Sequence, residues 1–374
     1  MNNEKYSRRR SALAAELMRR GLSAVMISDF EHGRDSSLRY LCGQPSDALL
    51  VVNSNGKSVL IAWDVNMAHR LGDADHILPF TDIGRQSAQA LKAAFELLGI
   101  EKGSKVALPA STPYPEYIEL VQSLDAFDLV CEKNGIDGFI KEMRSRKDAD
   151  EIDLYWMIAK YTDELMDMVE KEVAAGTLST ELDVALFLER EARRMGAEGM
   201  GFESLVAGPE RSFGIHAFPT FTAGPFANKG LSILDFGLRF EGYTSDVTMS
   251  FVDNLLNQEQ KTMIDLVEEA HRIAVEACGP GVSLLKVATL VDEFFANAGW
   301  FMPHSLGHGI GLDAHELPTL SMRAMPDDLL LPGHIVTIEP GLYHPELGGV
   351  RLENDVLITD TGAEVITHSR IVRL

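Results

Sequence analysis

Hydrophobic and polar residues alternate with two different periods over the first 135 positions of the chain. Short apolar runs bounded by turn residues predict strands at 23–27, 47–53, 58–63, 105–109 and 127–131. Apolar residues at helical spacing predict helices at about 5–20 and 86–98. This alternation is typical of an α/β domain, which we place at residues 1–135.

A charged stretch at 136–147 follows, and we interpret it as a linker into a second domain at 148–374. The second domain repeats one pattern, in which two helices precede a pair of strands. The helices are expected at 148–175 and 179–195, and again at 257–278 and 282–298. A repeated α-α-β-β unit predicts a pseudo-twofold α+β domain whose halves meet at one site.

Each expected strand pair carries two acidic residues, although acids are unusual in strands. The stretch LDFGLRFEGYTSDVTMSF holds Asp235 and Asp246 among apolar and β-branched neighbours. HIVTIEPGLY holds Glu339, and GGVRLENDVLIT holds Glu353. Carboxylates held together in a half-buried sheet repel each other unless a cation neutralises them. The pattern therefore favours a metal site between the two strand pairs.

Histidines gather in the segment PHSLGHGIGLDAHELP, among glycines and prolines that disfavour a regular helix. They are His304, His308 and His315, and His216 in GIHAFPT is a fourth candidate on weaker grounds. Singly each is more often structural, but imidazole is also the commonest neutral metal ligand and carries protons near neutral pH. Four carboxylates and one imidazole form an oxygen-rich set that favours pairs of Mn²⁺, Co²⁺ or Zn²⁺ over a thiolate zinc site.

Composition narrows the class of protein. With 374 residues, 45% of them hydrophobic, the chain can bury more than one core. A formal net charge of −22 argues against nucleic acid or an anionic membrane as a standing partner. Three widely spaced cysteines fit reduced thiols. With no apolar run typical of a signal peptide or a transmembrane helix, we expect a cytoplasmic protein.

The motifs together resemble those of the creatinase/aminopeptidase P/prolidase family. RYLCG and the preceding α/β pattern are similar to the creatinase-type N-terminal domain of that family. LDFGLRFEGYTSD, HSLGHGIGLDAHELP, TIEPGLY and GGVRLEN are similar to the four motifs of its catalytic domain. The resemblance implies a creatinase-like α/β domain followed by a pita-bread catalytic domain, and it is nearest to Xaa-Pro dipeptidase (prolidase).

The resemblance also implies a set of metal ligands, position by position. They are Asp235, Asp246, His308, Glu339 and Glu353. Asp246 and Glu353 would bridge two divalent ions, Asp235 would bind one ion, and His308 and Glu339 would bind the other. Manganese is the metal we expect, with cobalt, zinc and iron as alternatives.

Further residues are implied to act on the substrate. His216 and His315 would stabilise the tetrahedral intermediate or position the peptide, Glu339 would carry a proton, and His304 and Arg351 would line the pocket. Arg351 also shares a strand face with the glutamate two positions later, so it can reach that carboxylate or a carboxylate of the substrate. An ordinary surface arginine is the alternative.

The expected activity is hydrolysis of the Xaa-Pro bond in dipeptides or short peptides by attack of a metal-bridging hydroxide, in an enzyme that forms a homodimer. One alternative is another metal-dependent enzyme on this scaffold, a hydrolase or lyase of a small amino-acid derivative. A second alternative is a non-catalytic or metal-free creatinase-like protein. Relatives without metal chemistry lack ligands, whereas this chain keeps all five.

Three positions depart from the family pattern without removing a ligand. Met249 stands where the peptidases usually have arginine, Asn354 where they have aspartate, and Ile215 where they have proline. These departures bear on the surroundings of the ligands and on the pocket, and therefore on the substrate more than on the metal.

Overall fold

The computed structural model describes residues 4–31, 33–253 and 255–374. The chain forms two compact units, Met1–Met143 and Arg144–Leu374. The boundary between them falls within the segment that we interpret as the linker, and the extent of that linker stays a prediction. In that segment the structure has a helix, α6 (Ile136–Ser145).

A mixed sheet with the strand order β4-β3-β2-β1-β5-β6 forms the centre of the first unit. Its strands are β1 (Ala24–Asp29), β2 (Ala48–Asn53), β3 (Ser58–Ala62), β4 (His76–Pro79), β5 (Lys105–Leu108) and β6 (Asp128–Cys131). The accompanying helices are α1 (Glu4–Arg20), α2 (Ser37–Cys42), α3 (Val65–Leu71), η1 (Phe80–Ile83), α4 (Ser87–Leu97) and α5 (Tyr114–Ser123). One face of the sheet, which includes Met26 and Leu49, packs against Phe95 of α4. Contacts with α1 and α2 help to bury β1 and β2 almost throughout, as the continuous apolar runs predict.

The second unit is built from several small sheets. The strands of its first half are β7 (Gly199–Met200), β8 (Leu205–Ala207), β9 (Leu231–Phe236), β10 (Leu238–Phe240), β11 (Tyr243–Thr244) and β12 (Val247–Val252). Those of the second half are β13 (Gly307–Gly309), β14 (Glu316–Leu320), β15 (Ile335–Ile338), β16 (Gly341–His344), β17 (Gly348–Arg351), β18 (Asn354–Ile358), β19 (Ala363–Val365) and β20 (Ile371–Arg373). The two principal sheets have the orders β20-β12-β9-β8 and β14-β13-β15-β18-β19.

Two pairs of helices flank these sheets. They are α7 (Ala149–Ala174) with α8 (Glu181–Arg194), and α9 (Gln258–Ala277) with α10 (Leu284–Asn297). Capping boxes begin α7, α8 and α9, with Asp148, Thr180 and Asn257 as the N-cap residues. Such a box satisfies backbone N–H groups that the first turn leaves free, which explains why these boundaries are legible in the sequence.

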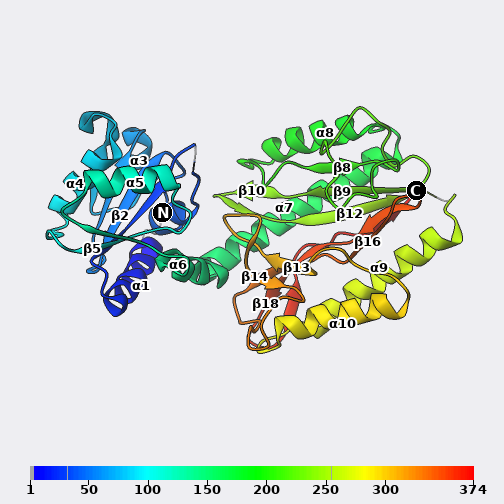
Figure 1. The fold of residues 1–374 in the computed structure, drawn as a ribbon. Helices are drawn as coiled ribbons and strands as arrows, with labels where there is room; N and C mark the ends of the chain where they lie inside the picture. Colours follow the sequence, from blue (N-terminus) through cyan, green and yellow to red (C-terminus); the bar gives the residue numbers. More distant parts are fainter. Residues whose placement is uncertain (1–3, 32, 254) are drawn as a thin grey trace. The chain divides into compact units, whose positions relative to one another are not determined.

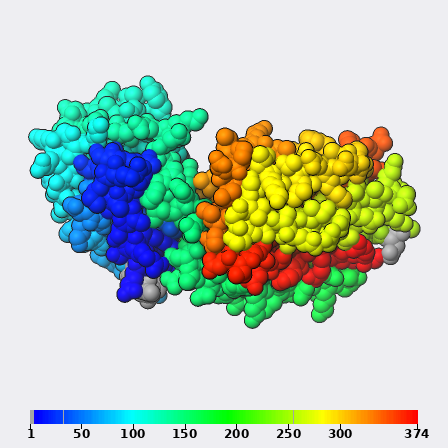
Figure 2. Space-filling model, turned by 90° about the horizontal axis from the view of Figure 1, so that it is seen from below, coloured from blue at the N-terminus to red at the C-terminus, as the bar shows by residue number. Residues whose placement is uncertain are grey.

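The helix pairs pack on the outer sides of the strands, as Figure 1 shows for α7 and α8 with β8 to β10, and for α9 and α10 with β14 to β17. Apolar residues of α9 and α10, such as Val267 and Phe295, share one core with Val336 and Val356 of the second strand group. In Figure 2 the yellow surface of α9 and α10 forms one face, and the red C-terminal residues run between it and the green α7. Arg370 fixes this last contact by ion pairs with Asp167 and Glu170 of α7.

The elements expected from the sequence end within two residues of those observed. Helices α2, α3 and α5 were not expected, and the histidine segment contains the short strands β13 and β14. These two strands are too short for a periodic pattern. They pair with each other, and β13 also pairs with β15. No helix formed by the described residues is long and apolar enough to cross a membrane.

Candidate metal centre

Both strand pairs of the second unit are interrupted at or beside acidic residues. In the first, β9 pairs with β12 and β10 with β11, and the breaks lie at Gly237 and at Asp246. In the second, β15 pairs with β18 and β16 with β17, and the breaks lie at Glu339 and Glu353. A Cβ on Gly237 would lie 1.8 Å from the carbonyl oxygen of Ser245, so only glycine permits this approach. Three of the four acids thus lie where the regular ladder stops.

The two strand pairs meet along β12. The backbone N–H of Glu353 donates to the carbonyl of Thr248 at 3.2 Å. The hydroxyl of Ser250 donates to the carbonyl of Arg351 at 2.8 Å and accepts from its N–H at 3.1 Å. This junction brings together segments that lie about a hundred positions apart in the chain.

Asp235 and Asp246 share one face of the first strand pair. Asp235 lies directly opposite Thr248, and Asp246 lies two positions before that threonine. The aspartates are therefore diagonal neighbours across the pair, rather than directly opposite as a simple hairpin would place them.

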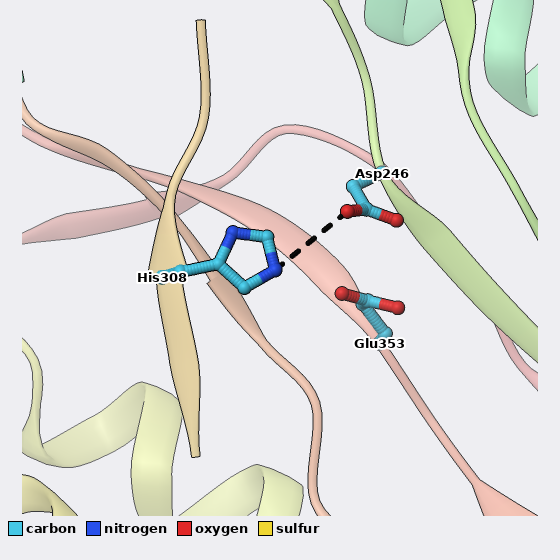
Figure 3. Close-up of side chains that lie close together, drawn as sticks. All are labelled: Asp246, His308 and Glu353. Atoms are coloured by element: carbon cyan, nitrogen blue, oxygen red, sulfur yellow. Dashed lines mark ion pairs between the residues drawn. The ribbon is translucent and has the colours of Figure 1, made fainter. Parts of the chain in front are cut away.

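Asp246, His308 and Glu353 form the centre of the site, and all three are buried. Each offers one atom to a set whose members all lie within 4.8 Å of one another. Figure 3 shows the imidazole of His308, from β13, pointing at the carboxylates of the other two residues. Its Nε2 lies 3.7 Å from Oδ2 of Asp246.

Glu339 extends the cluster from the end of β15. Its Oε1 lies 3.5 Å from Nε2 of His308, and its Oε2 lies 3.9 Å from Nδ1 of His304. Burial raises the pKa of Glu339 to about 8, although the charge of Arg351 opposes the shift. Nε2 of His304 in turn lies 3.1 Å from the hydroxyl of Tyr343.

Arg351 is buried beside the cluster, which excludes the alternative of a surface arginine. Its guanidinium donates to Oδ2 of Asp235 at 2.6 Å and to the hydroxyl of Tyr343 at 2.8 Å. It also donates to the carbonyl of Ile215 at 3.2 Å and to Oγ1 of Thr248 at 2.8 Å. The carboxylate that it reaches directly is thus Asp235 of the other strand pair.

The carboxylates at this site destabilise one another's charge. Burial, and then the charges of Glu353 and Asp235, raise the pKa of Asp246 well above its usual range. Burial, and then the charge of Glu339, do the same to Glu353. Burial also raises the pKa of Asp235, against the opposing effect of Arg351. A cluster with these properties is stable in its ionised form only beside additional positive charge.

The donor atoms fit a divalent cation. Burial lowers the pKa of His308 to about 4, so the imidazole is neutral near pH 7. Its Nδ1 lies 3.1 Å from the carbonyl of Gly309, a contact that favours the proton on Nδ1 and leaves the lone pair of Nε2 for a metal. Oδ1 of Asp235 is buried and has no hydrogen-bond partner among the residues that the structure describes. Carboxylate oxygens with one imidazole suit Mn²⁺, Co²⁺, Zn²⁺ or Fe²⁺.

The remaining predicted residues lie on the accessible side of the cluster. The ring of His315 is 4.1 Å from that of His308, measured between centroids, yet His315 is exposed. His216 is also exposed. Positive charge on the rings of His216 and His315 opposes the raised pKa of Asp235. The structure thus brings all nine predicted site residues into one region of the second unit, with two histidines open to solvent.

Other residues of this region were not singled out by the sequence. Thr248 donates from Oγ1 to Glu353 at 2.6 Å, and Asp355 accepts from the backbone N–H of Asp246 at 3.2 Å. Each lies two positions after a predicted ligand, and this spacing in a strand could have indicated them. Tyr343 carried no such signal, because its contacts with His304 and Arg351 depend on how the strands fold together.

The three departures have distinct surroundings. Met249 is fully buried. It follows Thr248, which pairs with Asp235, so its side chain lies on the opposite face of the strand. Asn354 makes contact through Nδ2 with Nε2 of His271 at 3.2 Å and accepts from the backbone N–H of Ser369 at 2.6 Å. Ile215 supplies the carbonyl that Arg351 binds.

The chain is similar to known metallopeptidases along most of its length. Residues 156–360 match the model of metallopeptidase family M24. A putative dipeptidase of Bacillus subtilis is 30% identical over 308 residues, which cover 80% of this chain and 78% of the relative. An Xaa-Pro dipeptidase of Pyrococcus furiosus is 33% identical over 254 residues, covering 67% of this chain and 71% of the relative.

Solved structures show the same likeness in three dimensions. The prolidase from Pyrococcus horikoshii OT3 superposes with a TM-score of 0.83 at 25% identity, covering 97% of this chain and 99% of the other. The X-Pro aminopeptidase from Thermotoga maritima MSB8 also gives 0.83, at 26% identity, covering 98% and 99%. The expected fold, a creatinase-like α/β domain followed by a pita-bread domain, is confirmed. The chain therefore belongs to metallopeptidase family M24.

Proposed function

We propose that this metallopeptidase hydrolyses the bond before proline in dipeptides or short peptides, with two divalent ions per chain. The observation that carries the proposal is the convergence of four carboxylates, two buried and two partly buried, and a neutral imidazole beside two exposed histidines. The names of the relatives and of the solved structures, which include Xaa-Pro dipeptidases and prolidases, support the choice of substrate.

The ligands that we propose are Asp235, Asp246, His308, Glu339 and Glu353. Asp246 and Glu353, in the middle of the cluster, would serve both ions, while Asp235 would serve one and His308 and Glu339 the other. When bound, such ions polarise a carbonyl group and lower the pKa of a water molecule, which then acts as the nucleophile. Four carboxylates balance the charge of two divalent ions.

Residues around the ligands supply binding and proton transfer. Glu339 accepts the proton of the attacking water and delivers it to the proline nitrogen that leaves. His216 and His315, on the exposed side, donate to the carbonyl oxygen as negative charge develops there. His304 and Arg351 remain proposed substrate-binding residues, and the contact of Arg351 with Asp235 favours a further role in orienting that carboxylate.

We further propose manganese as the native metal, a homodimer as the assembly and the cytoplasm as the location. Hard oxygen ligands favour manganese among the alternatives. Cys42, Cys131 and Cys278 carry free thiols, which suits a reducing compartment. Elemental analysis and light scattering on purified protein test the first two assignments, and fractionation of the source cells tests the third.

A substrate panel tests the proposed activity. Purified protein loaded with Mn²⁺ should release proline from Ala-Pro and Leu-Pro dipeptides, and it should leave Ala-Ala and Leu-Ala intact. Ala-Pro-Ala distinguishes a dipeptidase from an aminopeptidase, which would cleave the tripeptide too. Metal-loaded protein that turns over an N-acyl amino acid but no Xaa-Pro peptide would replace this proposal by another hydrolase on the same scaffold.

A further inference from the structure

Away from the metal centre, the first residue of α8 carries a buried carboxylate. Glu181 is 1% exposed, and its Oε1 accepts from the backbone N–H of Gly208 at 2.7 Å. Its Oε2 accepts from the backbone N–H and the hydroxyl of Thr222, both at 2.6 Å, and from the guanidinium of Arg211 at 2.5 Å. One side chain thus receives four hydrogen bonds.

These donors belong to a single loop, residues 208–222, which carries His216. Gly208 and Thr222 are its two ends, so the carboxylate of Glu181 closes the loop at its base. The helix start binds the loop a second time, because the N–H of Leu182 donates to the carbonyl of Thr222 at 2.9 Å. Arg211 crosses the loop and donates to the carbonyl of Pro219.

The far side of the 208–222 loop touches the metal centre. The carbonyl of Ile215 accepts from Arg351, which holds Asp235. The hydroxyl of Ser212 accepts from the N–H of Gly349, in the strand that leads to Arg351, at 3.0 Å. The loop therefore spans the distance between Glu181 and the proposed ligands, and His216 follows directly after the residue in contact with Arg351.

The chemistry of these contacts requires an ionised acceptor. All four groups around the side chain of Glu181 donate, and the start of a helix favours negative charge. A glutamine would present its own NH₂ group to at least one donor, leaving a buried donor without a partner.

We propose that Glu181 is a positioning residue, which closes the 208–222 loop and so fixes His216 relative to the metal centre. The inference rests on the proposed role of His216. Because Glu181 does not touch the cluster itself, its replacement should leave metal binding intact while it loosens the loop.

The test compares Glu181→Gln with Asp183→Asn. Asp183 lies in the same helical turn but contacts Thr180, with which it forms the capping box, so its replacement weakens the helix start without touching the loop ends. Glu181→Gln should speed hydrogen exchange within 208–222, keep the bound metal and lower kcat by about 10- to 100-fold, the scale of a misplaced reacting group. Asp183→Asn should leave exchange in the loop and kcat near wild type.

A double-mutant cycle with His216→Ala separates positioning from general damage. If Glu181 acts through His216, Glu181→Gln should lower kcat no further in the His216→Ala background. An equal loss in both backgrounds, or unchanged exchange in 208–222, would overturn the inference. Hydrogen exchange is measured on the protein without any substrate, so an inactive wild-type protein would refute the proposed peptidase activity and not the closure of the loop.

A milder substitution keeps the test decisive should Glu181→Gln fail to fold. Thr222→Val removes one donor and retains the shape of the side chain, and Thr222→Ser restores the hydroxyl. Thr222→Val should speed exchange in the loop, and Thr222→Ser should return it to the wild-type rate. Equal exchange in the two variants would again contradict the proposal.

Discussion

Buried carboxylates occur at two places in the second unit, and the two places differ in what surrounds the carboxylates. At the metal centre, Asp246 and Glu353 are 5% and 2% exposed, and each lies within the repulsive field of further carboxylates. At the start of α8, Glu181 is equally buried but accepts four hydrogen bonds, one of them from a guanidinium. Burial alone therefore does not indicate a metal site. A metal site is indicated by a shortage of hydrogen-bond donors and of positive charge around the buried carboxylates.

Glu316 gives an intermediate case a few residues from the predicted ligand His308. It is paired with two cations, Arg144 at 2.5 Å and Lys147 at 3.5 Å, and all three side chains are buried. Its charge is compensated within the protein, so we assign it a structural role. The four predictions that follow test this division between compensated and uncompensated carboxylates.

The largest effect is expected at the metal centre itself. Chelation should abolish activity, and Asp246→Asn should lower it by more than the roughly 10- to 100-fold typical of an outer partner, because this carboxylate would serve both ions. Asp235→Asn should lower activity less, since that carboxylate would serve only one of the two ions. Metal content by elemental analysis and turnover of Ala-Pro measure both variants. Equal losses would contradict the shared role of Asp246, and active protein without metal would end the proposal.

The next largest effect distinguishes the two adjacent histidines, His308 and His315. His315→Ala should keep the metal and the melting temperature while kcat falls by about 10²-fold, the scale of lost proton transfer or charge stabilisation. His308→Ala should deplete one metal and lower the melting temperature as well, because metal binding is coupled to folding. Full turnover in the His315 variant would remove that residue from the mechanism. Two retained metals in the His308 variant would overturn the ligand set.

A compensated carboxylate should affect folding and leave the metal in place. Glu316→Gln should lower the free energy of unfolding by about 3 kcal/mol, because Arg144 and Lys147 stay buried without their partner. The matched control is Asp313→Asn, which removes the half-exposed partner of the same arginine and should cost less than about 1 kcal/mol. Urea unfolding and elemental analysis measure both variants, and loss of metal from the Glu316 variant would place that residue among the uncompensated carboxylates.

The smallest effect is expected in the first unit, where burial raises the pKa of Asp29 to about 6 despite the N–H of Asp35 and the charge of Arg34. Because the pKa is higher in the folded state, the stabilisation is complete below about pH 4 and is lost as pH rises through 6. Asp29→Asn should remove this loss of stability. Relative to the wild type, the free energy of unfolding of the variant should rise by about 1 to 2 kcal/mol between pH 4 and pH 7.5.

Unfolding of the first unit at the two pH values measures the effect of Asp29→Asn. Asp47→Asn, which alters a partly exposed partner of the same Arg34, is the control and should keep most of the wild-type pH dependence, because burial and not the charge of Asp47 is the main cause of the raised pKa of Asp29. A parallel pH dependence in the Asp29 variant and the wild type would show that Asp29 does not titrate in this range.

The sequence by itself determined the elements whose signals are local. Helices α7, α8 and α9 were predicted to within two residues, because capping residues such as Asp148, Thr180 and Asn257 satisfy the first turn from within the same segment. Strands β1, β2 and β3 of the first unit were equally legible, since a strand buried on both faces is a continuous apolar run. Strand β4, whose residues are exposed or half-buried, was not predicted. The four acidic residues among the predicted ligands stood out because acids inside strands contradict their surroundings, and the family resemblance added His308.

Only the tertiary structure decided which of these charges are compensated. Arg351 was predicted to reach Glu353, two positions later, or a carboxylate of the substrate, and its guanidinium in fact binds Asp235, 116 positions away. Glu181 stands at a helix start, where acids are common, and its four donors come from a loop that begins 27 positions later. Local sequence patterns record the backbone needs of one segment. The partners of a buried charge depend on how distant segments pack, and that packing distinguishes the metal centre from the carboxylates that hold the fold around it.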